Sequence, residues 1–445
     1  MTTFLAFVFV LGVLVFVHEL GHFLAAKRVG IKVLKFQLGF NPTIVSFRRG
    51  DTEYSIGALP LGGYVKMAGE TPEDGPTGNN DEFLSKSKWE RFQVLIMGPV
   101  MNLALAVVLL AVVLYQGAEV PVYQDQPPVV GAVTPDSPAA KADIRRGDRV
   151  LTVANRRVET WEQFFIAVGT RPNREVTITL NRGGNELARQ VTPGTVPDSK
   201  FEIGDIGVWP DAHPHVPRVT AGEPADKAGI KPGDVILEIN GEPIVLPSQL
   251  VGIIGRHTGK PITVTVRREG ERRNFTVTPI TGCNGVVGDQ GCIGVGLGEE
   301  TKKIQPGVFQ AVVMSVRRNV EMTVLILDTI WGLLTRETSP KQLMGPVAIA
   351  QLSGESAQLG WIALFSLMAN ISLNLGLLNL MPVPVLDGGH IFIMALEGVA
   401  RRDFSMRVKE KMLLAGFVVL MMLMVTAIYN DLTRISWIER LMPWR

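Results

Sequence analysis

The segment FVFVLGVLVFVHELGHFLAAK, residues 7–27, carries two histidines and a glutamate at the end of a long apolar run. No charged side chain occurs in residues 1–17. About 20 apolar residues suffice for a helix to cross a bilayer. Ionisable groups are costly in hydrocarbon, and within membrane spans they mark functional sites. The segment therefore predicts a membrane protein and directs attention to His18, Glu19 and His22.

The rest of the chain contains three more segments of this kind, at residues 94–116, 361–381 and 412–429. The composition agrees, because mean hydropathy is +0.22 and only 19% of the 445 residues are charged. We therefore expect four transmembrane helices. A cleaved signal peptide is the alternative for the first segment, but no Lys or Arg precedes it and no clean cleavage region follows it. The net charge of +2 gives no reason to expect nucleic acid as a partner.

Basic residues predict the orientation of these spans, because loops rich in Lys and Arg stay in the cytoplasm. Two loops carry them, one after the first span and one between the last two. With four spans, both termini and residues 120–360 then lie on the opposite side. The basic residues are Lys27, Arg28, Lys32, Lys35, Arg48 and Arg49 in the first loop, and Arg401, Arg402, Arg407, Lys409 and Lys411 in the second.

The long polar region contains an internal repeat. Residues 133–158 align without a gap on residues 219–244, at an offset of 86. Each copy has a short helical piece, a Gly-Asp turn and an alternating strand, followed by a hairpin pattern. We expect two small α+β modules, at 119–205 and 206–282.

The pattern of both copies resembles PDZ domains, which bind extended peptide termini at a sheet edge. The second copy is the closer match, because it keeps Gly229 and Gly241 where the first has Asp143 and Asn155. Two interpretations stay open for the modules. They either capture peptides or act as folded spacers that exclude substrates by bulk.

The two histidines of the opening segment have the spacing of a metal site. His18 and His22 are four residues apart, so on a helix they share one face. Zinc accepts imidazole nitrogen, and a catalytic zinc keeps one position open for water. Glu19 is placed to take a proton from that water in this H-E-x-x-H pattern. The alternative is a pair of packed, hydrogen-bonded histidines.

The segment NLMPVPVLDGGHIF, residues 379–392, offers the third ligand. Pro382 and Pro384 interrupt the helix after the third span, which a membrane protein tolerates only where the backbone faces protein or a water-filled cavity. Asp387 follows as the candidate ligand, and the amide of Asn379 could bind a substrate backbone or an oxyanion. His390 is the competing ligand, and a helix N-cap is the structural alternative for Asp387.

Together the H-E-x-x-H motif and N-x-x-P-x-P-x-L-D-G, residues 379–388, resemble the site-2 protease family of intramembrane zinc metalloproteases. The tandem PDZ-like modules narrow the resemblance to its bacterial regulator-of-sigma-E protease type. The resemblance implies zinc on His18, His22 and Asp387, with Glu19 as the catalytic base. It assigns substrate handling to a further set, Asn379, Pro382 and Pro384.

The same resemblance implies single-span membrane proteins as substrates, such as a previously trimmed anti-sigma factor, and leftover signal peptides. It places the chain in the bacterial inner membrane, with the PDZ-like modules and both termini in the periplasm. Two other classes remain as alternatives. One is an inactive membrane-tethered PDZ scaffold, and the other is a membrane-anchored zinc peptidase for soluble chains.

Smaller features complete the predicted architecture. Residues 52–67 predict a membrane-associated β-hairpin whose edge could hold unwound substrate, and residues 307–334 predict an amphipathic helix lying on the lipid surface. Cys283 and Cys292 either form a disulfide or remain free thiols. The expected divisions are a first membrane part at 1–118, the two modules, a connecting region at 283–360 and a second membrane part at 361–445.

Overall fold

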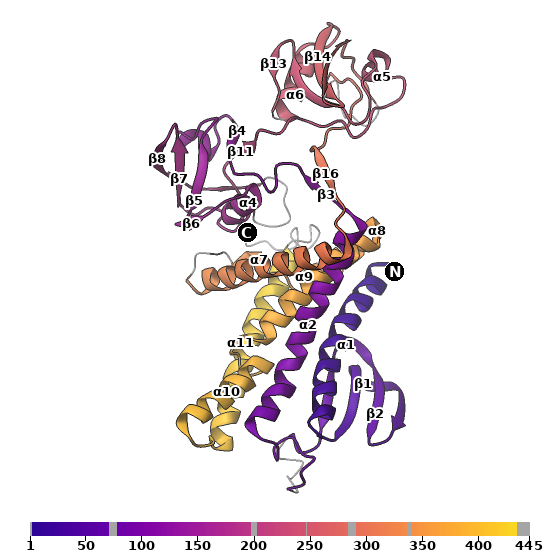
Figure 1. The fold of residues 1–445 in the computed structure, drawn as a ribbon, viewed down its shortest axis with the longest axis vertical. Helices are drawn as coiled ribbons and strands as arrows, with labels where there is room; N and C mark the ends of the chain where they lie inside the picture. The colour runs from indigo at the N-terminus through magenta and orange to yellow at the C-terminus, as the bar shows by residue number, and fades with distance from the viewer. Residues whose placement is uncertain are drawn as a thin grey trace. The chain divides into compact units, whose positions relative to one another are not determined.

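The computed structural model describes residues 2–70, 78–196, 203–245, 247–283, 291–335, 338 and 340–433. The chain separates into two compact units (Figure 1). One comprises Met1–Ala118, Gln305–Leu334 and Pro340–Arg445, and the other comprises Glu119–Ile304 and Thr335–Ser339. Distant parts of the sequence, before and after the repeats, therefore build the first unit together.

Among the described residues, four helices of the first unit are long and apolar enough to cross a membrane, as the sequence predicts. They are α1 (Thr2–Arg28), α2 (Lys88–Gln116), α9 (Trp361–Asn379) and α11 (Met406–Thr433). The helix α2 packs against both α1 and α9. Apolar side chains from these three helices fill a shared core that includes Leu14, Leu109 and Met368. Figure 1 shows α2 running beside α1 in this unit.

The helix α7 (Val308–Leu334) has the predicted amphipathic character and is not among the helices suited to span a membrane. Its buried residues Ala311, Ser315 and Asn319 recur every four positions, so they form one face. The Ser315 hydroxyl donates a hydrogen bond of 2.7 Å to the backbone oxygen of Val107 in α2. Large apolar side chains are exposed elsewhere on α7, among them Phe309, Val313, Val320, Val324, Trp331 and Leu334.

Two shorter helices flank the spans. The helix α8 (Pro346–Leu359) begins at a buried carboxylate of α11, because Asp431 accepts hydrogen bonds of 3.0 Å from the backbone of Gly345, Val347 and Ala348. Such a cap satisfies donors that a helix start leaves unpaired. The capping residue lies more than 80 positions away, so no local pattern predicts α8. The other helix, α10 (Asp387–Ala400), follows the proline-interrupted segment.

The strands β1 (Val33–Arg49) and β2 (Thr52–Met67) form a strongly curled sheet against α1. Residues 35–38 pair with residues 53–56 on one side and with residues 63–66 on the other. The predicted hairpin at 52–67 is therefore one long strand, and its partner is a segment assigned to the basic loop. The turn lies at Gly50, which has a positive φ of 61°. The stretch near residues 63–67 is left at an edge of this sheet.

The first module of the second unit has a four-stranded sheet in the order β6-β5-β7-β8 and its own apolar core. Around Trp161 and Phe164, both almost fully buried, this core collects side chains from the sheet and from α4. Ile206 and Val208 belong to the same core, and β11 pairs with β4. The elements are β4 (Val130–Val133), α3 (Pro138–Lys141), β5 (Arg149–Val153), β6 (Arg156–Arg157), α4 (Trp161–Gly169), β7 (Val176–Arg182), β8 (Asn185–Val191), β9 (Gly194–Thr195), β10 (Gly204–Asp205) and β11 (Val208–Pro210).

The second module repeats this arrangement with the sheet order β13-β12-β14-β15 and a separate core. Ile293 lies in that core, beyond the predicted end of the module at 282. The elements are α5 (Pro224–Ala228), β12 (Val235–Ile239), β13 (Glu242–Pro243), α6 (Pro247–Arg256), β14 (Ile262–Arg268) and β15 (Glu271–Val277), while β16 (Thr301–Ile304) pairs with β3 (Ala118–Pro121).

The repeated Gly-Asp turns have the same role in both modules. Asp148, 1% exposed, accepts hydrogen bonds of 2.7 and 2.8 Å from the guanidinium of Arg182. At the same offset of 86 residues, Asp234 accepts bonds of 2.6 and 2.7 Å from Arg268. A bidentate pair of this kind fixes the turn against the sheet. The structural repeat thus extends beyond the segment in which the sequences align without a gap.

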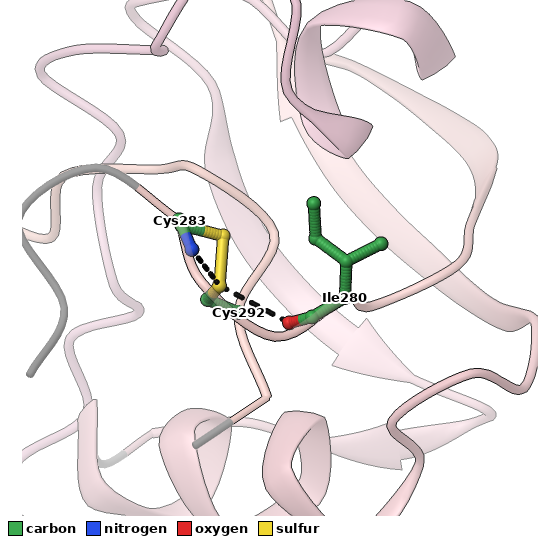
Figure 2. Close-up of a disulfide and its surroundings, with 3 residues drawn as sticks. All are labelled: Ile280, Cys283 and Cys292. Carbon is green, nitrogen blue, oxygen red and sulfur yellow. Dashed lines mark hydrogen bonds between the residues drawn. A yellow bond between two sulfur atoms is a disulfide. The ribbon is translucent and has the colours of Figure 1, made fainter. Parts of the chain in front are cut away.

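Cys283 and Cys292 form a disulfide in the second module (Figure 2). Beside it, Ile280 and Cys292 exchange backbone hydrogen bonds of 3.0 and 2.8 Å. The sequence left this pairing open. Residues 284–290 between the two cysteines lie outside the described part of the chain.

Candidate metal centre

The histidines of α1 and the carboxylate that begins α10 meet in the membrane unit. His18 Nε2 lies 3.2 Å from His22 Nε2, and Asp387 Oδ2 lies 3.2 Å from the first nitrogen and 3.4 Å from the second. These three side chains form the group of potential metal ligands found among the described residues. The structure therefore brings together three groups that are up to 369 positions apart in the sequence.

The triangle of donor atoms fits a zinc ion. A tetrahedral ion with ligands at about 2.0–2.1 Å has its ligand atoms about 3.3 Å apart. The three separations of 3.2, 3.2 and 3.4 Å match that value. Two imidazoles and one carboxylate also leave the fourth position of a catalytic zinc open. The donor set and its dimensions thus fit this metal.

Glycines after Asp387 allow its carboxylate to reach the histidines. A Cβ at Gly388 would overlap the backbone of Leu380, and a Cβ at Gly389 would overlap that of Val383. The proline-interrupted segment can lie directly on α10 only because both side chains are absent. The N-cap position of α10 is Leu386, and no side chain caps this helix. The carboxylate of Asp387 therefore faces the histidines instead of capping the helix.

The helix α2 supplies no ligand but contacts both histidines. The ring nitrogen Nδ1 of His22 donates a 2.8 Å hydrogen bond to the backbone oxygen of Val94. His18 Nδ1 lies 3.1 Å from the side-chain amide of Asn102. Between these positions, a Cβ at Gly98 would overlap the ring of His22. Val94, Gly98 and Asn102 are four residues apart, so they form one face of α2.

Gly98 and Asn102 are a small and a polar residue one helical turn apart, a pattern that is typical of a packing surface between membrane helices. The packing surface is in fact the pair of histidines, which no property of α2 by itself reveals. The one available signal is the spacing of four residues, shared by Gly98 and Asn102 with His18 and His22.

Glu19 and the sheet edge lie next to each other. Glu19 follows His18 in α1 but does not belong to the ligand triangle. A Cβ at Gly63 in β2 would lie 3.3 Å from Glu19 Cγ and 3.0 Å from the side chain of Val15. Gly63 thus lets the edge of the β1–β2 sheet approach the face of α1 that carries Glu19.

The remaining predicted site residues lie on the segment that connects α9 to α10. Asn379 ends α9 and is half-buried, and within the described part of the chain its amide has no hydrogen bond. Pro382 is exposed, while Pro384 packs on α11, where a Cβ at Gly416 would lie 2.8 Å from the proline ring. His390 is exposed and lies outside the ligand group. The structure therefore favours Asp387 over His390 as a partner of the histidines.

Comparisons with known proteins agree with this geometry. The model of Peptidase family M50 matches residues 6–423. The chain is 33% identical to the regulator of sigma-E protease RseP of Salmonella typhimurium, over 97% of this chain and 98% of that protein. It is also 33% identical to a putative zinc metalloprotease of Vibrio cholerae, with the same coverage of each. Among solved structures, the PDZ domain of an SdrC-like protein from Listeria monocytogenes is 19% identical and covers 20% of this chain and 90% of its own, with a TM-score of 0.18. By the family match and the near full-length relatives, this chain belongs to peptidase family M50, the site-2 protease family that its motifs predict.

Proposed function

We propose that this chain hydrolyses peptide bonds within the membrane-spanning segments of other proteins, with zinc held by His18, His22 and Asp387. The family is a peptidase family, and relatives of this chain are named zinc metalloproteases. The observation that carries the proposal is the triangle of donor atoms. Two of its corners lie on an apolar helix long enough to span a membrane, and the third follows the proline-interrupted end of another.

The residues around the triangle suit peptide hydrolysis. Bound zinc supplies a positive charge that polarises the scissile carbonyl and lowers the pKa of a water molecule. Glu19 accepts the proton of that water and delivers it to the leaving amine. The amide of Asn379 donates a hydrogen bond to the carbonyl oxygen as negative charge develops on it. The carboxylate of Asp387 lies against Nε2 of both His18 and His22 and so helps to orient both rings.

A substrate helix must be unwound first, because its carbonyl groups are hydrogen-bonded internally. We assign this step to the edge of β2 near residues 63–67, which pairs with β1 on one side. An added strand would satisfy the backbone groups of the unwound substrate. Support comes from the closeness of Gly63 to Glu19, which brings that edge to the proposed base. We assign substrate contact to the proline-interrupted segment before Asp387, in which Pro382 is exposed and Pro384 packs on α11.

The natural substrate is a single-span membrane protein. A relative is named for regulation of sigma E, which suggests an anti-sigma factor already shortened by another protease, and remnant signal peptides fit the same site. The two modules have the PDZ-like pattern, and they either bind peptide termini or exclude bulky substrates. We propose that the two modules are separate domains. The first extends from 205 to 210 because Ile206 and Val208 lie in its core, and the second extends beyond 282 because Ile293 lies in its core.

We place the chain in the bacterial inner membrane, with the modules and both termini in the periplasm. The basic loops support this orientation. A disulfide in the second module supports it too, because disulfides persist in oxidising compartments. The end of the chain after Thr433 lies outside the described residues.

The test uses purified full-length protein in detergent with a single-span membrane protein as substrate. We expect cleavage inside the span, lost on zinc chelation and restored by added zinc. Glu19→Gln should lower the rate at least about 100-fold, because a general base contributes 100-fold or more, while zinc content stays unchanged. Glu186→Gln, at an exposed position of β8, is the matched control.

Equal cleavage by wild type, Glu19→Gln and chelated protein would defeat the mechanism. Two other outcomes correspond to the alternative functions. No cleavage by zinc-loaded wild type would indicate an inactive scaffold, and cleavage of soluble chains with the membrane span left intact would indicate a conventional anchored peptidase.

A further inference from the structure

Asn102 is a buried polar side chain whose position in a membrane helix calls for a reason. It is 0% exposed, in the middle of α2. Its amide nitrogen Nδ2 lies 3.1 Å from Nδ1 of His18. Its amide oxygen Oδ1 is buried and has no hydrogen-bond partner within the described part of the chain. A buried polar atom without a partner is costly, so native structures seldom contain one.

The chemistry of His18 decides which amide atom should face its ring. To bind zinc through Nε2, the neutral imidazole carries its proton on Nδ1, which is then a donor. Nδ2 of Asn102 is a donor as well, so this orientation sets two donors against each other. Half a turn of the amide exchanges oxygen and nitrogen within the same space. Oδ1 then accepts the proton of His18 Nδ1, and no competing partner holds Oδ1 where it is.

The other histidine already shows this arrangement. His22 Nδ1 donates to the backbone oxygen of Val94, which leaves His22 Nε2 free for the metal. Histidine ligands commonly donate their second ring nitrogen in this way, and the acceptor fixes the tautomer and the ring orientation. Val94 and Asn102 belong to the same face of α2, so one helix offers an acceptor to each histidine.

A third helix holds Asn102 in position. The hydroxyl of Ser372 in α9 donates a hydrogen bond of 2.8 Å to the backbone oxygen of Asn102. Ser372 is itself fully buried. The contact fixes the backbone of α2 at the level of His18 and leaves the amide side chain for the histidine.

We propose that Asn102 is a positioning residue of the metal centre, whose amide oxygen accepts the Nδ1 proton of His18 and so presents Nε2 to zinc. The inference rests on the proposed zinc site. It assigns to α2 the task of orienting both histidine ligands, one through its backbone and one through this side chain.

The test measures the zinc dissociation constant of the full-length protein in detergent by competition with a chelator of known affinity. Asn102→Leu has a similar volume but no acceptor, and we expect it to weaken zinc binding about 10- to 100-fold. Asn102→Asp keeps an acceptor oxygen and should bind zinc at least as tightly as wild type. Asn319→Leu makes the same change at another buried asparagine, in α7, whose amide donates to the backbone oxygen of Ser315; it serves as the matched control and should stay within about threefold.

Cobalt provides a second readout, because its visible absorption reports the geometry of the ligands. Wild type and Asn102→Asp should give the same bands, and Asn102→Leu shifted or weaker ones. Wild-type zinc affinity in Asn102→Leu would overturn the inference, and so would equal losses in the Leu and Asp variants, which would indicate packing alone. If Asn102→Leu does not fold, Asn102→Ala removes the acceptor without adding bulk and decides the question. Failure of wild type to bind zinc would instead defeat the proposed function.

Discussion

Asp148 illustrates how a single buried charge fixes a turn. Burial raises the pKa of its carboxyl group, but hydrogen bonds from the Arg182 guanidinium and from the backbone of Arg145 outweigh burial, so the pKa lies below its ordinary value of 3.8. A carboxyl group with a lowered pKa in the folded state stabilises that state at neutral pH. This stabilisation is complete above the unfolded value and disappears as the pH falls through the folded one.

We therefore predict that the first module loses stability below about pH 4. Asp148→Asn should lower its free energy of unfolding by about 1–3 kcal/mol at pH 7, less than for a fully buried pair because Arg182 is 28% exposed. The variant should also show a flatter dependence on pH. Urea denaturation followed by 19F NMR of fluorotryptophan at Trp161, in the same core, measures both.

Asp211→Asn, at an exposed position, is the control and should leave the midpoint unchanged. The same pH dependence in wild type and Asp148→Asn would contradict this assignment.

The candidate ligands could be predicted from sequence because chemistry and spacing coincide in them. His18 and His22 repeat at one helical turn, and Asp387 follows prolines that make sense only beside a cavity. Asn102 could not be predicted, since an asparagine in an apolar helix has a role only once the facing helix is known. The spacing of residues in the sequence shows which of them share a helix face, but only the structure shows which helix packs against that face.

The β1–β2 sheet is the element that sequence patterns describe least well. The sequence predicts a hairpin within 52–67, but this stretch is one strand. Its partner at 33–49, which contains Lys35 and ends with Arg48 and Arg49, lies in the predicted basic loop. Gln37 explains its stability, because this fully buried amide accepts a 2.9 Å hydrogen bond from Ser55 and donates one of 2.9 Å to the oxygen of Gly39. Such a buried polar cluster depends on pairing that a linear pattern does not contain.

We expect proline in the edge near Glu19 to impair cleavage, because proline removes a backbone donor from the strand. Tyr64→Pro and Val65→Pro should each lower the cleavage rate of a membrane-spanning substrate at least about tenfold, the effect of about one lost hydrogen bond. Arg48→Pro, in the stretch 43–49 of β1, is the control and should have a much smaller effect. Unchanged cleavage in the Tyr64 and Val65 variants would remove the sheet edge from the mechanism.

The exposed apolar side chains of α7 predict contact with lipid. Trp331 is 61% exposed on this helix, whereas Trp161 of the first module is 2% exposed. The difference in fluorescence between wild type and Trp331→Phe gives the emission of Trp331. We expect brominated acyl chains in the vesicle to quench this emission strongly. The fluorescence assigned to Trp161 in the same way should be unaffected. Absence of quenching at Trp331 would show that α7 is not embedded in the membrane surface.

At the scale of the whole molecule, the proposed orientation can be tested directly. A reporter enzyme that is active only in the periplasm should be active when fused after Pro193, and one that is active only in the cytoplasm should not. Under non-reducing conditions both cysteines of protein from cells should resist alkylation, and a Cys283→Ser, Cys292→Ser variant should lose about 2–3 kcal/mol of stability in the second module. A cytoplasmic reporter, or alkylation of both sulfurs, would reverse the assignment.

Four spans and a repeated module could be predicted because long apolar runs and gapless self-similarity are strong signals. The helix α8 and the extent of each core could not be predicted. Asp431 caps α8 from a distant part of the sequence, and Ile293 packs into the second core from beyond the repeated segment, so no local pattern shows either contact.

The distance in sequence between the first two candidate ligands and the third also governs the order in which the centre can form. His18 and His22 are synthesised with α1, before both modules, while Asp387 is synthesised only after both modules have been made. A nascent chain therefore holds two of the three donors and cannot complete the site. The proteolytic centre remains unassembled during most of its own synthesis, so the protein is made without exposing neighbouring nascent spans to a working protease.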